Sequence, residues 1–369
     1  MGTDRPVGLG IVGCGVISQA YLAALRSFPG IALRAVADRR PDAAAARAAE
    51  FGVPAVSPAE LFADRDIELV LNLTTPRAHV EVGLAALAAG KHVYSEKPLA
   101  LSLGEARQLL LAARAKGRRL GCAPDTFLGG PQQTARALLD RGAIGEIVGG
   151  TAFLQLAGHE RWHPDPGFSY AREGGGPVLD MGPYYVTALV HLLGPVARVM
   201  AMGRTVRAVR TVATGPRAGT RIPVACTTHV VGTLELVAGP LVQIALSFEV
   251  WGHRHPPLEI YGTKGSLAVP DPNGFAGTVE LLEAGGEWRP VPLEHGFADG
   301  DLVGLGVADM ARALRSGRPH RCDGALAFHV LEVLDALVRA AEGAGVVDIT
   351  SRCARPAPLP PGLAHGQLD

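Results

Sequence analysis

The fold of this chain is decided by the stretch Val7-Gly8-Leu9-Gly10-Ile11-Val12-Gly13-Cys14-Gly15-Val16-Ile17-Ser18. Its first six residues have the pattern of a short buried strand, and helical periodicity runs from Ile17 to Phe28. Between them lies a G-x-G-x-x-S variant of the dinucleotide-binding turn. Gly13 allows the tight bend, Gly15 lets the backbone approach a pyrophosphate, and the small Ser18 permits close packing of helix against strand. The stretch therefore predicts a helix N-terminus that faces phosphate groups.

Asp38 directly follows the next predicted strand, Ile31 to Ala37. An acidic residue at this point accepts hydrogen bonds from both hydroxyls of the adenosine ribose and repels a 2′-phosphate. Asp38 therefore favours NAD over NADP. Arg39 and Arg40 keep NADP as an alternative, since a guanidinium can stack on adenine or pair with a phosphate. A purely structural reading, a glycine turn beside a helix-capping Asp, is the other alternative.

Strand and helix patterns alternate over the first third of the chain. Further apolar strand runs are expected over 67–73, 92–94 and 119–123, and helices over 41–51, 79–89 and 102–116. Repeated strand–helix units of this length predict a doubly wound parallel sheet. We assign this α/β sheet to an NAD(P)-binding Rossmann domain over residues 1–128.

The pattern changes after Pro131, where strands are separated by turns that contain Gly. Hairpins are expected for 230–236 with 242–250, for 258–261 with 266–269, and for 279–283 with 288–293. Consecutive hairpins predict a large, mostly antiparallel sheet. Helices over 307–314 and 328–341 are expected to cover one of its faces. We assign residues 129–369 to a second, α+β domain.

Composition restricts the class of protein and of partner. The chain has 369 residues, 48% hydrophobic and 19% charged, as expected for a compact globular protein. Lys+Arg and Asp+Glu both number 35, and this balance argues against nucleic acid or an anionic membrane as a partner. Residues 1–6 lack a signal-peptide pattern, and no apolar run reaches the roughly eighteen residues of a membrane span. Five scattered cysteines without a C-x-x-C pair suggest reduced thiols and a cytoplasmic protein.

The triplet Glu96-Lys97-Pro98 carries the clearest chemical signal. It follows the run His92-Val93-Tyr94, at the mouth of the predicted nucleotide-binding sheet. A Lys pinned there by a Pro and flanked by a carboxylate is poorly explained as a surface charge. It is better explained as a cation that polarises a hydroxyl or carbonyl beside a bound cofactor.

Four motifs occur together in one order. They are Gly10-Ile11-Val12-Gly13-Cys14-Gly15, Thr74-Thr75-Pro76-Arg77-Ala78-His79, Gly90-Lys91-His92-Val93-Tyr94-Ser95-Glu96-Lys97-Pro98 and Gly174-Gly175-Gly176-Pro177-Val178-Leu179-Asp180-Met181-Gly182-Pro183-Tyr184. With them, essentially the whole chain resembles the glucose–fructose oxidoreductase / inositol dehydrogenase / MocA (Gfo/Idh/MocA) family of sugar and polyol dehydrogenases. The resemblance implies a nicotinamide cofactor on the N-terminal domain and a carbohydrate substrate held between the domains. It also implies that the α+β domain over residues 129–369 serves substrate binding and oligomerisation. The residues expected to contact the cofactor are Gly13, Gly15, Val16, Ile17, Asp38, Arg39, Thr74, Thr75, Pro76, His79, Glu96, Lys97 and Trp162.

The resemblance also implies catalytic roles. Lys97 matches the family's catalytic Lys, and Asp180 matches the acidic residue that orients the reacting hydroxyl. Tyr184, one helical turn after Asp180 and expected on the same helix face, stands where many members carry an acid/base His. A free phenol has a pKa of about 10, and a nearby ammonium such as Lys97 would lower that pKa. Tyr185 is the competing Tyr, and a merely packed Tyr184 is the alternative to the catalytic one.

The segment around His163 is expected to approach cofactor and substrate, by resemblance. Trp162 offers an indole for a sugar to stack on, and His163 is taken as a substrate contact. His159 and His163 have the spacing of a metal pair, but the prolines that follow disfavour a helix, and no metal site is expected. Asp125 follows the strand that ends at Ala123, at the edge where parallel sheets bind ligands, with capping of a loop as its alternative role.

Three functions are compatible with these residues. The first is an NAD(P)-dependent dehydrogenase that transfers hydride between a secondary hydroxyl of a sugar, polyol or glycoside and nicotinamide. The second is a glycoside-cleaving lyase or hydrolase that oxidises its substrate transiently with bound NAD. The third is a non-catalytic sugar- or NAD-sensing regulator, which would not need Lys97, Asp180 and Tyr184 together. A homodimer or homotetramer is expected by analogy with the family.

Overall fold

The computed structural model describes residues 5–300, 302–363 and 366–369, so four of the six N-terminal residues considered above lie outside the described part. The chain divides into two compact units. The first contains Met1–Gly129, Glu294–Phe328 and Pro356–Asp369, and the second contains Gly130–Leu293 and His329–Arg355. The division after Gly129 lies beside the expected boundary at 128/129. The segments 294–328 and 356–369, however, belong to the first unit, where the sequence assigned them to the second domain.

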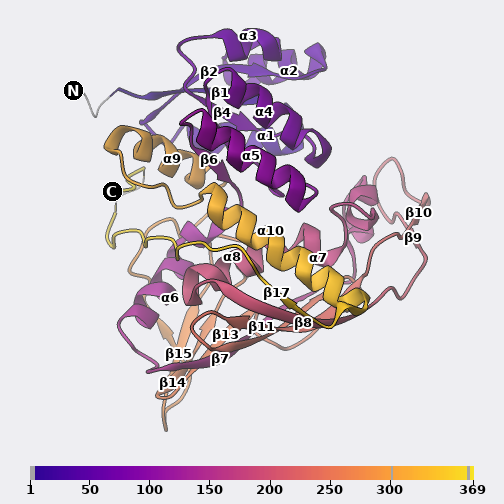
Figure 1. Cartoon of the computed structure of the whole chain (residues 1–369), viewed down its shortest axis with the longest axis vertical. Helices are drawn as coiled ribbons and strands as arrows, with labels where there is room; N and C mark the ends of the chain where they lie inside the picture. Colours follow the sequence, from indigo (N-terminus) through magenta and orange to yellow (C-terminus); the bar gives the residue numbers. More distant parts are fainter. Residues whose placement is uncertain (1–4, 301, 364–365) are drawn as a thin grey trace. The chain divides into compact units, whose positions relative to one another are not determined.

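The first unit is built on a six-stranded sheet in the order β3-β2-β1-β4-β5-β6 (Figure 1). Every adjacent pair is parallel, which confirms the predicted doubly wound sheet. The order reverses between β1 and β4, and ligands bind at the carboxyl ends of strands at such a switch point. The strands are β1 Val7–Val12, β2 Ile31–Ala37, β3 Ala55–Val56, β4 Leu69–Asn72, β5 His92–Ser95 and β6 Leu120–Cys122.

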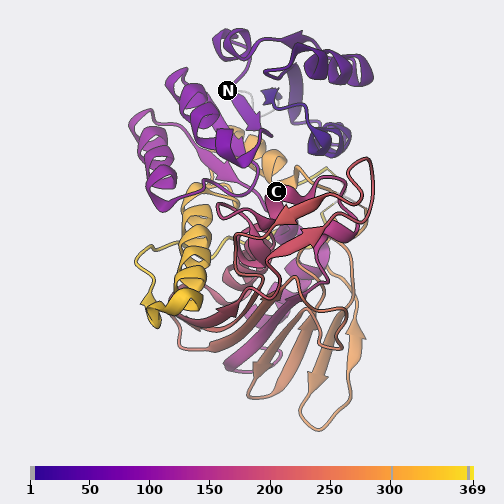
Figure 2. The ribbon, with the colours of Figure 1, turned by 90° about the vertical axis from the view of Figure 1, so that its right-hand side faces the viewer.

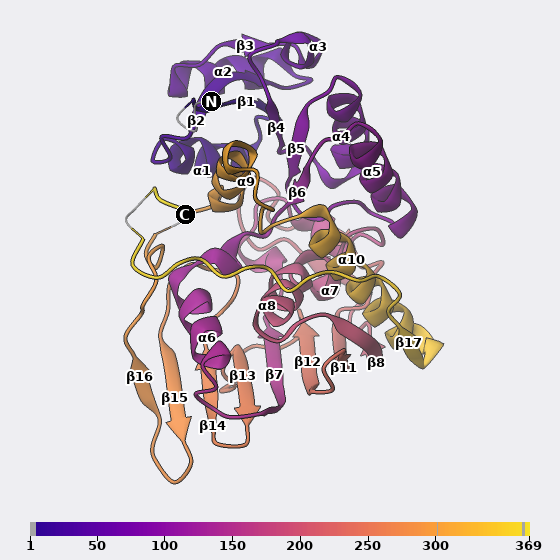
Figure 3. The same ribbon diagram turned by 60° about the vertical axis from the view of Figure 1, so that its left-hand side comes forward.

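Helices cover both faces of this sheet, and β1 is consequently buried along its whole length. α1 and α9 lie on one face, and α4 and α5 on the other (Figure 3). Local signals begin two of these helices, because Ser57 and Ser102 each accept a hydrogen bond from the N–H of the residue three positions later. The helices are α1 Val16–Leu25, α2 Pro41–Phe51, α3 Pro58–Ala63, α4 His79–Ala88, α5 Leu103–Ala115 and α9 Leu305–Ser316, with short turns η1 Pro76–Ala78 and η2 Thr126–Leu128.

The second unit is built on a nine-stranded sheet in the order β16-β15-β14-β13-β7-β12-β11-β8-β17. All three predicted hairpins form, and only the pair β7–β12 is parallel. This confirms the predicted large, mostly antiparallel sheet. The strands are β7 Ile147–Gln155, β8 Val196–Arg204, β11 His229–Leu236, β12 Leu241–Ser247, β13 Leu258–Gly262, β14 Gly265–Val269, β15 Val279–Glu283, β16 Arg289–Val291 and β17 Val346–Asp348.

Helices of the second unit pack against one face of its sheet (Figure 2). α6 Gly130–Asp140 lies over β14 and β15, α7 Gly176–Asp180 over β11 and β12, and α8 Gly182–Leu193 over β7. The chain segment that connects β8 to β11 forms a separate two-stranded ribbon, β9 Val209–Thr211 with β10 Arg221–Pro223. α10 Gly324–Arg339 contains the boundary between the units, after Phe328. Within the described part of the chain, no helix combines the length and apolarity that crossing a membrane requires.

Candidate active site

The glycine turn lies at the carboxyl end of β1, where the sheet order reverses. Gly13 has φ +105°, and a Cβ there would come within 2.5 Å of the Leu73 carbonyl group, so the turn requires glycine. A Cβ at Gly15 would meet no heavy atom of the described residues within 4 Å. No side chain caps the N-terminus of α1, and Val16 in its first turn is 91% exposed. The turn thus leaves open space beside the uncapped first turn of a helix.

Asp38 is tied to this turn through both carboxylate oxygens. Oδ2 accepts a hydrogen bond of 2.8 Å from the N–H of Cys14, and Oδ1 accepts one of 2.9 Å from the N–H of Arg40. The Arg40 Nε atom lies 3.8 Å from Oδ1, and the neighbouring Arg39 is exposed. The carboxylate is therefore fixed beside the glycine turn, and its oxygens keep lone pairs for further donors.

His79 joins the loops that follow β4 and β5. Its Nε2 lies 3.0 Å from the Thr74 carbonyl oxygen, and its Nδ1 lies 2.7 Å from that of Pro98. Burial lowers the pKa of His79, and the two carbonyl groups partly offset this effect. Asn72, at the end of β4, accepts from the Thr74 hydroxyl at 2.6 Å and donates to the His79 carbonyl at 2.9 Å. The His79 ring thus holds the two loops together. Thr75 and Pro76, in the loop that follows β4, are exposed.

Glu96 holds the backbone of Lys97. Its Oε2 accepts a hydrogen bond of 2.8 Å from the Lys97 N–H, and its Oε1 accepts one of 2.7 Å from the hydroxyl of Tyr21 on α1. The peptide bond between Lys97 and Pro98 is cis. Lys97 is half-buried at the carboxyl end of β5. Its main chain is thus fixed from one side by Glu96 and from the other by the contact of Pro98 with His79.

Asp125 is buried, and its contacts are those of a helix cap. Oδ2 accepts hydrogen bonds of 2.9 Å from the N–H groups of Gly304 and Gly306, at the start of α9. Burial raises the pKa of this carboxyl to about 6, although the two N–H donors oppose the shift. These contacts support the capping role that the sequence left open beside the substrate role.

Asp180 and Tyr184 lie on two successive helices, which corrects the expectation of a single helix. Asp180 is the last residue of α7, and Tyr184 is in the first turn of α8. Pro183 explains the break, because it lacks the N–H that would bond to the preceding turn. Tyr184 is half-buried, whereas Tyr185 is 2% exposed and donates a hydrogen bond of 3.0 Å to Asp271.

Asp180 belongs to a group of three buried polar side chains. Its Oδ2 accepts a hydrogen bond of 3.0 Å from the Ser169 hydroxyl and lies 3.3 Å from Nδ1 of His159. The same Nδ1 lies 2.9 Å from Oγ of Ser169. From the sequence, His159 was considered only as half of a metal pair, and Ser169 was not predicted as a site residue. The spacing of Ser169 and Asp180 along the chain does not indicate that their side chains are in contact.

Trp162 and His163 lie beside this group on an exposed edge. Trp162 is 62% exposed, and its ring makes edge contacts with those of His159 and His163. His163 accepts a hydrogen bond of 3.0 Å at Nδ1 from the N–H of Asp165. The two histidines thus have separate partners, and among the described residues no cluster of three or more His, Cys, Asp or Glu side chains is arranged to hold a metal ion.

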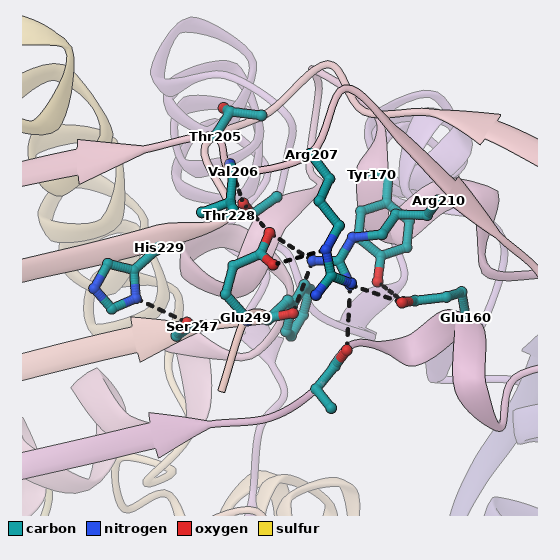
Figure 4. A network of polar contacts seen from close by, with 12 residues as sticks. Glu160, Tyr170, Thr205, Val206, Arg207, Arg210, Thr228, His229, Ser247 and Glu249 are labelled. Atoms are coloured by element: carbon teal, nitrogen blue, oxygen red, sulfur yellow. Dashed lines mark hydrogen bonds and ion pairs between the residues drawn. The ribbon is translucent and has the colours of Figure 1, made fainter. Parts of the chain in front are cut away.

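A buried ion network lies next to His159 in the chain and was missed by the sequence reasoning (Figure 4). Arg210, on β9, is 2% exposed and pairs with Glu160 at 2.7 Å and Glu249 at 2.6 Å. It also donates to the Phe248 carbonyl at 2.8 Å, and the Tyr170 hydroxyl donates to Glu160. The Arg210 guanidinium therefore joins β9 to the segment that follows β12 and to the turn η3 His159–Arg161, and Glu160 extends the network to Tyr170 in the turn η4 Pro166–Tyr170.

Comparison with known families decides the class of this protein. The family model described as "Oxidoreductase family, NAD-binding Rossmann fold" matches residues 7–123, and the "GFO/IDH/MocA C-terminal domain" model matches residues 132–268. The chain belongs to the Gfo/Idh/MocA oxidoreductase family. The two matched ranges fall within the parallel-sheet unit and the nine-stranded-sheet unit, respectively.

Relatives in the family cover the chain to different extents. An uncharacterized oxidoreductase of Schizosaccharomyces pombe is 33% identical over 138 residues, which are 37% of this chain and 36% of that protein. The 1,5-anhydro-D-fructose reductase of Ensifer adhaerens is 27% identical over 293 residues, 77% of this chain and 82% of that protein. Among solved structures, levoglucosan dehydrogenase in complex with NADH has the same fold, with a TM-score of 0.81 and 22% identity over 94% of this chain and all of that one.

The first unit of this Gfo/Idh/MocA protein fits a dinucleotide. The open space at Gly15 leaves room for a backbone contact with a pyrophosphate, and the first turn of α1 has N–H groups without a side-chain cap. Asp38 holds a carboxylate at the end of β2, where a ribose is bound in folds of this kind. These features are consistent with the NAD-binding description of the family model.

Proposed function

We propose that this protein is an NAD-dependent oxidoreductase that transfers hydride between a secondary hydroxyl of a sugar, polyol or glycoside and nicotinamide. The observation that carries the proposal is the fixed position of the Lys97 backbone. Glu96 and His79 hold the main chain around Lys97 at the edge of a sheet of the dinucleotide-binding type. The names of two similar proteins, 1,5-anhydro-D-fructose reductase and levoglucosan dehydrogenase, support a carbohydrate substrate.

The cofactor would be held by the edge of the parallel sheet. Gly13, Gly15, Val16 and Ile17 would face the pyrophosphate, and Asp38 would accept hydrogen bonds from the adenosine ribose. The remaining contacts would come from Arg39, Thr74, Thr75, Pro76, Glu96, Lys97 and Trp162, with His79 placing two of their loops. Because a carboxylate repels a 2′-phosphate, we propose NAD and not NADP as the cofactor.

Lys97, Asp180 and Tyr184 would carry the proton chemistry. The ammonium of Lys97 polarises the reacting oxygen, and the carboxylate of Asp180 accepts a hydrogen bond that orients the hydroxyl. A phenolate of Tyr184 accepts the hydroxyl proton during oxidation, and the phenol so formed returns it during reduction. The bound nicotinamide supplies the hydride acceptor at C4. His163 and the indole of Trp162 would contact the rest of the sugar, while Asp125 acts through the α9 cap.

A screen of sugars, polyols and glycosides for NAD reduction tests the proposal. Steady accumulation of NADH with at least one carbohydrate, lost in Lys97→Ala while NAD still binds, is the expected result. Turnover without net NADH would instead identify the lyase or hydrolase that uses NAD transiently. Binding of NAD and sugar without any turnover would identify a sensing protein, and unchanged turnover in Lys97→Ala would refute the role of Lys97.

We also propose a homodimer or homotetramer formed through the nine-stranded sheet. Met200 and Met202 are 53% and 82% exposed on β8, and their strand partners Val346 and Val231 are 60% and 38% exposed. These four side chains share the sheet face opposite the helices, and exposed apolar patches commonly mark interfaces. Light scattering coupled to size exclusion should give a multiple of the chain mass, and Met202→Lys should shift it towards monomer. A monomeric wild type would remove the proposal.

All five cysteines are reduced thiols, as expected in a reducing compartment. On this ground we propose that the protein is cytoplasmic. Fractionation of cells that express the full chain tests this location, and recovery outside the cytoplasmic fraction would contradict it.

A further inference from the structure

The group His159–Ser169–Asp180 has a defined order of protons. All three side chains are at most 8% exposed, so water does not replace their mutual contacts. The Ser169 hydroxyl donates its one hydrogen to Asp180. Ser169 must then accept at Oγ, and the atom within reach is Nδ1 of His159, at 2.9 Å. Nδ1 therefore carries the hydrogen, and Asp180, 3.3 Å away, attracts the same hydrogen.

We propose that His159 is a positioning residue for Asp180, acting through its Nδ1–H and the hydroxyl of Ser169. This inference rests on the proposed function of Asp180 in orienting the reacting hydroxyl. With Oδ2 occupied by these two neighbours, the carboxylate has one fixed orientation. A carboxylate that can rotate loses the alignment on which the reaction rate depends.

The ion network around Arg210 fixes the two residues that position Asp180. Glu160 follows His159 in the chain, Tyr170 follows Ser169, and both bind in this network (Figure 4). Gly158 has φ +108°, and a Cβ there would come within 2.2 Å of Glu160 and 2.7 Å of Arg210. The network therefore fixes the backbone next to His159 in η3 and next to Ser169 in η4. Both side chains contact Asp180 from these fixed positions.

The ring of His159 is also held by packing. Its centroid lies 4.6 Å from that of Phe248 and 5.1 Å from that of Trp162. Phe248 is fully buried, and its carbonyl accepts a hydrogen bond from Arg210. The ring plane and the direction of Nδ1 are thus fixed by the same elements that hold the backbone.

Three substitutions distinguish a positioning role from a proton-accepting one. His159→Ala removes the donor, His159→Asn restores an N–H donor near the place of Nδ1, and His159→Gln offers its N–H further out, near Nε2. We expect His159→Ala and His159→Gln to lower kcat roughly 100-fold with the KM for NAD unchanged. His159→Asn should recover most of that loss. An Asn variant as slow as the Ala variant, or an Ala variant as fast as wild type, would overturn the proposal.

A double-mutant cycle with Ser169 tests the coupling. Since both residues act through Asp180, Ser169→Ala should be as slow as His159→Ala, and the double variant no slower than either. Losses that multiply would contradict a shared action. Thermal unfolding of each variant separates these effects from loss of structure, and His159→Gln replaces His159→Ala in the same cycle if the Ala variant does not fold.

Ring ¹⁵N resonances of His159 provide a test that does not depend on turnover. Wild type should contain the Nδ1–H tautomer, and Asp180→Asn should shift the ring towards Nε2–H. An Nε2–H ring in wild type would refute the inference even if the enzyme oxidises sugars. Conversely, an Nδ1–H ring in a protein that turns over no carbohydrate would leave this hydrogen-bond order standing and refute the proposed function alone.

Discussion

The hydroxyl of Tyr21 donates a hydrogen bond of 2.7 Å to Oε1 of Glu96. Tyr21 is fully buried in α1, and Glu96 follows β5, so the bond joins the helix of the glycine turn to the loop that carries Lys97. The other oxygen of Glu96 accepts from the Lys97 N–H. The position of the proposed catalytic lysine therefore depends on the same helix that would hold the cofactor phosphates.

Tyr21→Phe should lower the free energy of unfolding by about 2 kcal/mol, because it removes a hydrogen bond to a charged group. Tyr94→Phe is the matched control. Tyr94 is as buried, but its hydroxyl has no hydrogen-bond partner among the described residues. Denaturant unfolding should leave the Tyr94 variant within about 0.5 kcal/mol of wild type. Equal losses in the two variants would contradict the importance of the Glu96 contact.

Asp38→Ser should change the choice of cofactor. Removing the carboxylate takes away the repulsion of a 2′-phosphate and one acceptor for the ribose, so kcat/KM should fall for NAD and rise for NADP. The ratio of the two should change by roughly 100-fold or more, equivalent to about 3 kcal/mol. Asp42→Asn removes an exposed carboxylate on α2 and should leave the ratio unaltered. A preference for NADP in the wild type would overturn the assignment.

Tyr184→Phe should mainly lower kcat, whereas Tyr185→Phe should mainly lower stability. If Tyr184 transfers the proton, its Phe variant should lose roughly 10²- to 10⁴-fold in kcat. Tyr185→Phe removes the hydrogen bond to Asp271 and should cost about 1 kcal/mol of stability with little change in kcat. Steady-state kinetics and unfolding on both variants test the pair. If Tyr184→Phe keeps the kcat of the wild type, another group must transfer the proton.

Asp125→Asn should remove part of the pH dependence of stability. The pKa of Asp125 rises from 3.8 to about 6 on folding, so between these values the folded state binds more protons than the unfolded state. Stability therefore falls as pH rises through this window, by about 3 kcal/mol from this group alone. Unfolding free energies of wild type and variant at pH 4 and pH 7 isolate the difference. Parallel curves would refute a protonated Asp125.

Arg210→Lys should be strongly destabilising although the charge is kept. A lysine cannot reach Glu160, Glu249 and the Phe248 carbonyl at once, and each buried group left unpaired is costly. We expect a loss of about 3 kcal/mol in the free energy of unfolding. Arg198→Lys, in a pair with Glu235 on the exposed surface, should cost less than about 1 kcal/mol. Similar losses at both positions would contradict a special role for the buried network.

The three hairpins of the second unit were predictable because the residues that form them are close in sequence. Gly239 and Gly285 adopt positive φ in two of the turns, where the sequence expected turns. The pairing of β7 with β12 was not predictable in the same way, because Ile147–Gln155 and Leu241–Ser247 are far apart along the chain. No local pattern in either strand identifies the strand with which it pairs.

The single helix expected through Asp180 and Tyr184 was wrong for a local reason that the sequence did contain. Gly182-Pro183 lies between them, and Pro183 cannot donate the hydrogen bond that would continue α7 into α8. The identity of the two residues is a property of the sequence, but their relative orientation is not.

By itself, the sequence determined the Rossmann sheet, the glycine turn, the family and the residues matched to its motifs, because each depends on short-range patterns. Only the tertiary structure decided what surrounds them. Asp180 meets His159 and Ser169, and Arg210 joins Glu160 and Glu249, across separations that no local pattern encodes. The physical reason is that burial makes each polar group depend on a partner, and the fold alone selects which partner comes within hydrogen-bonding distance.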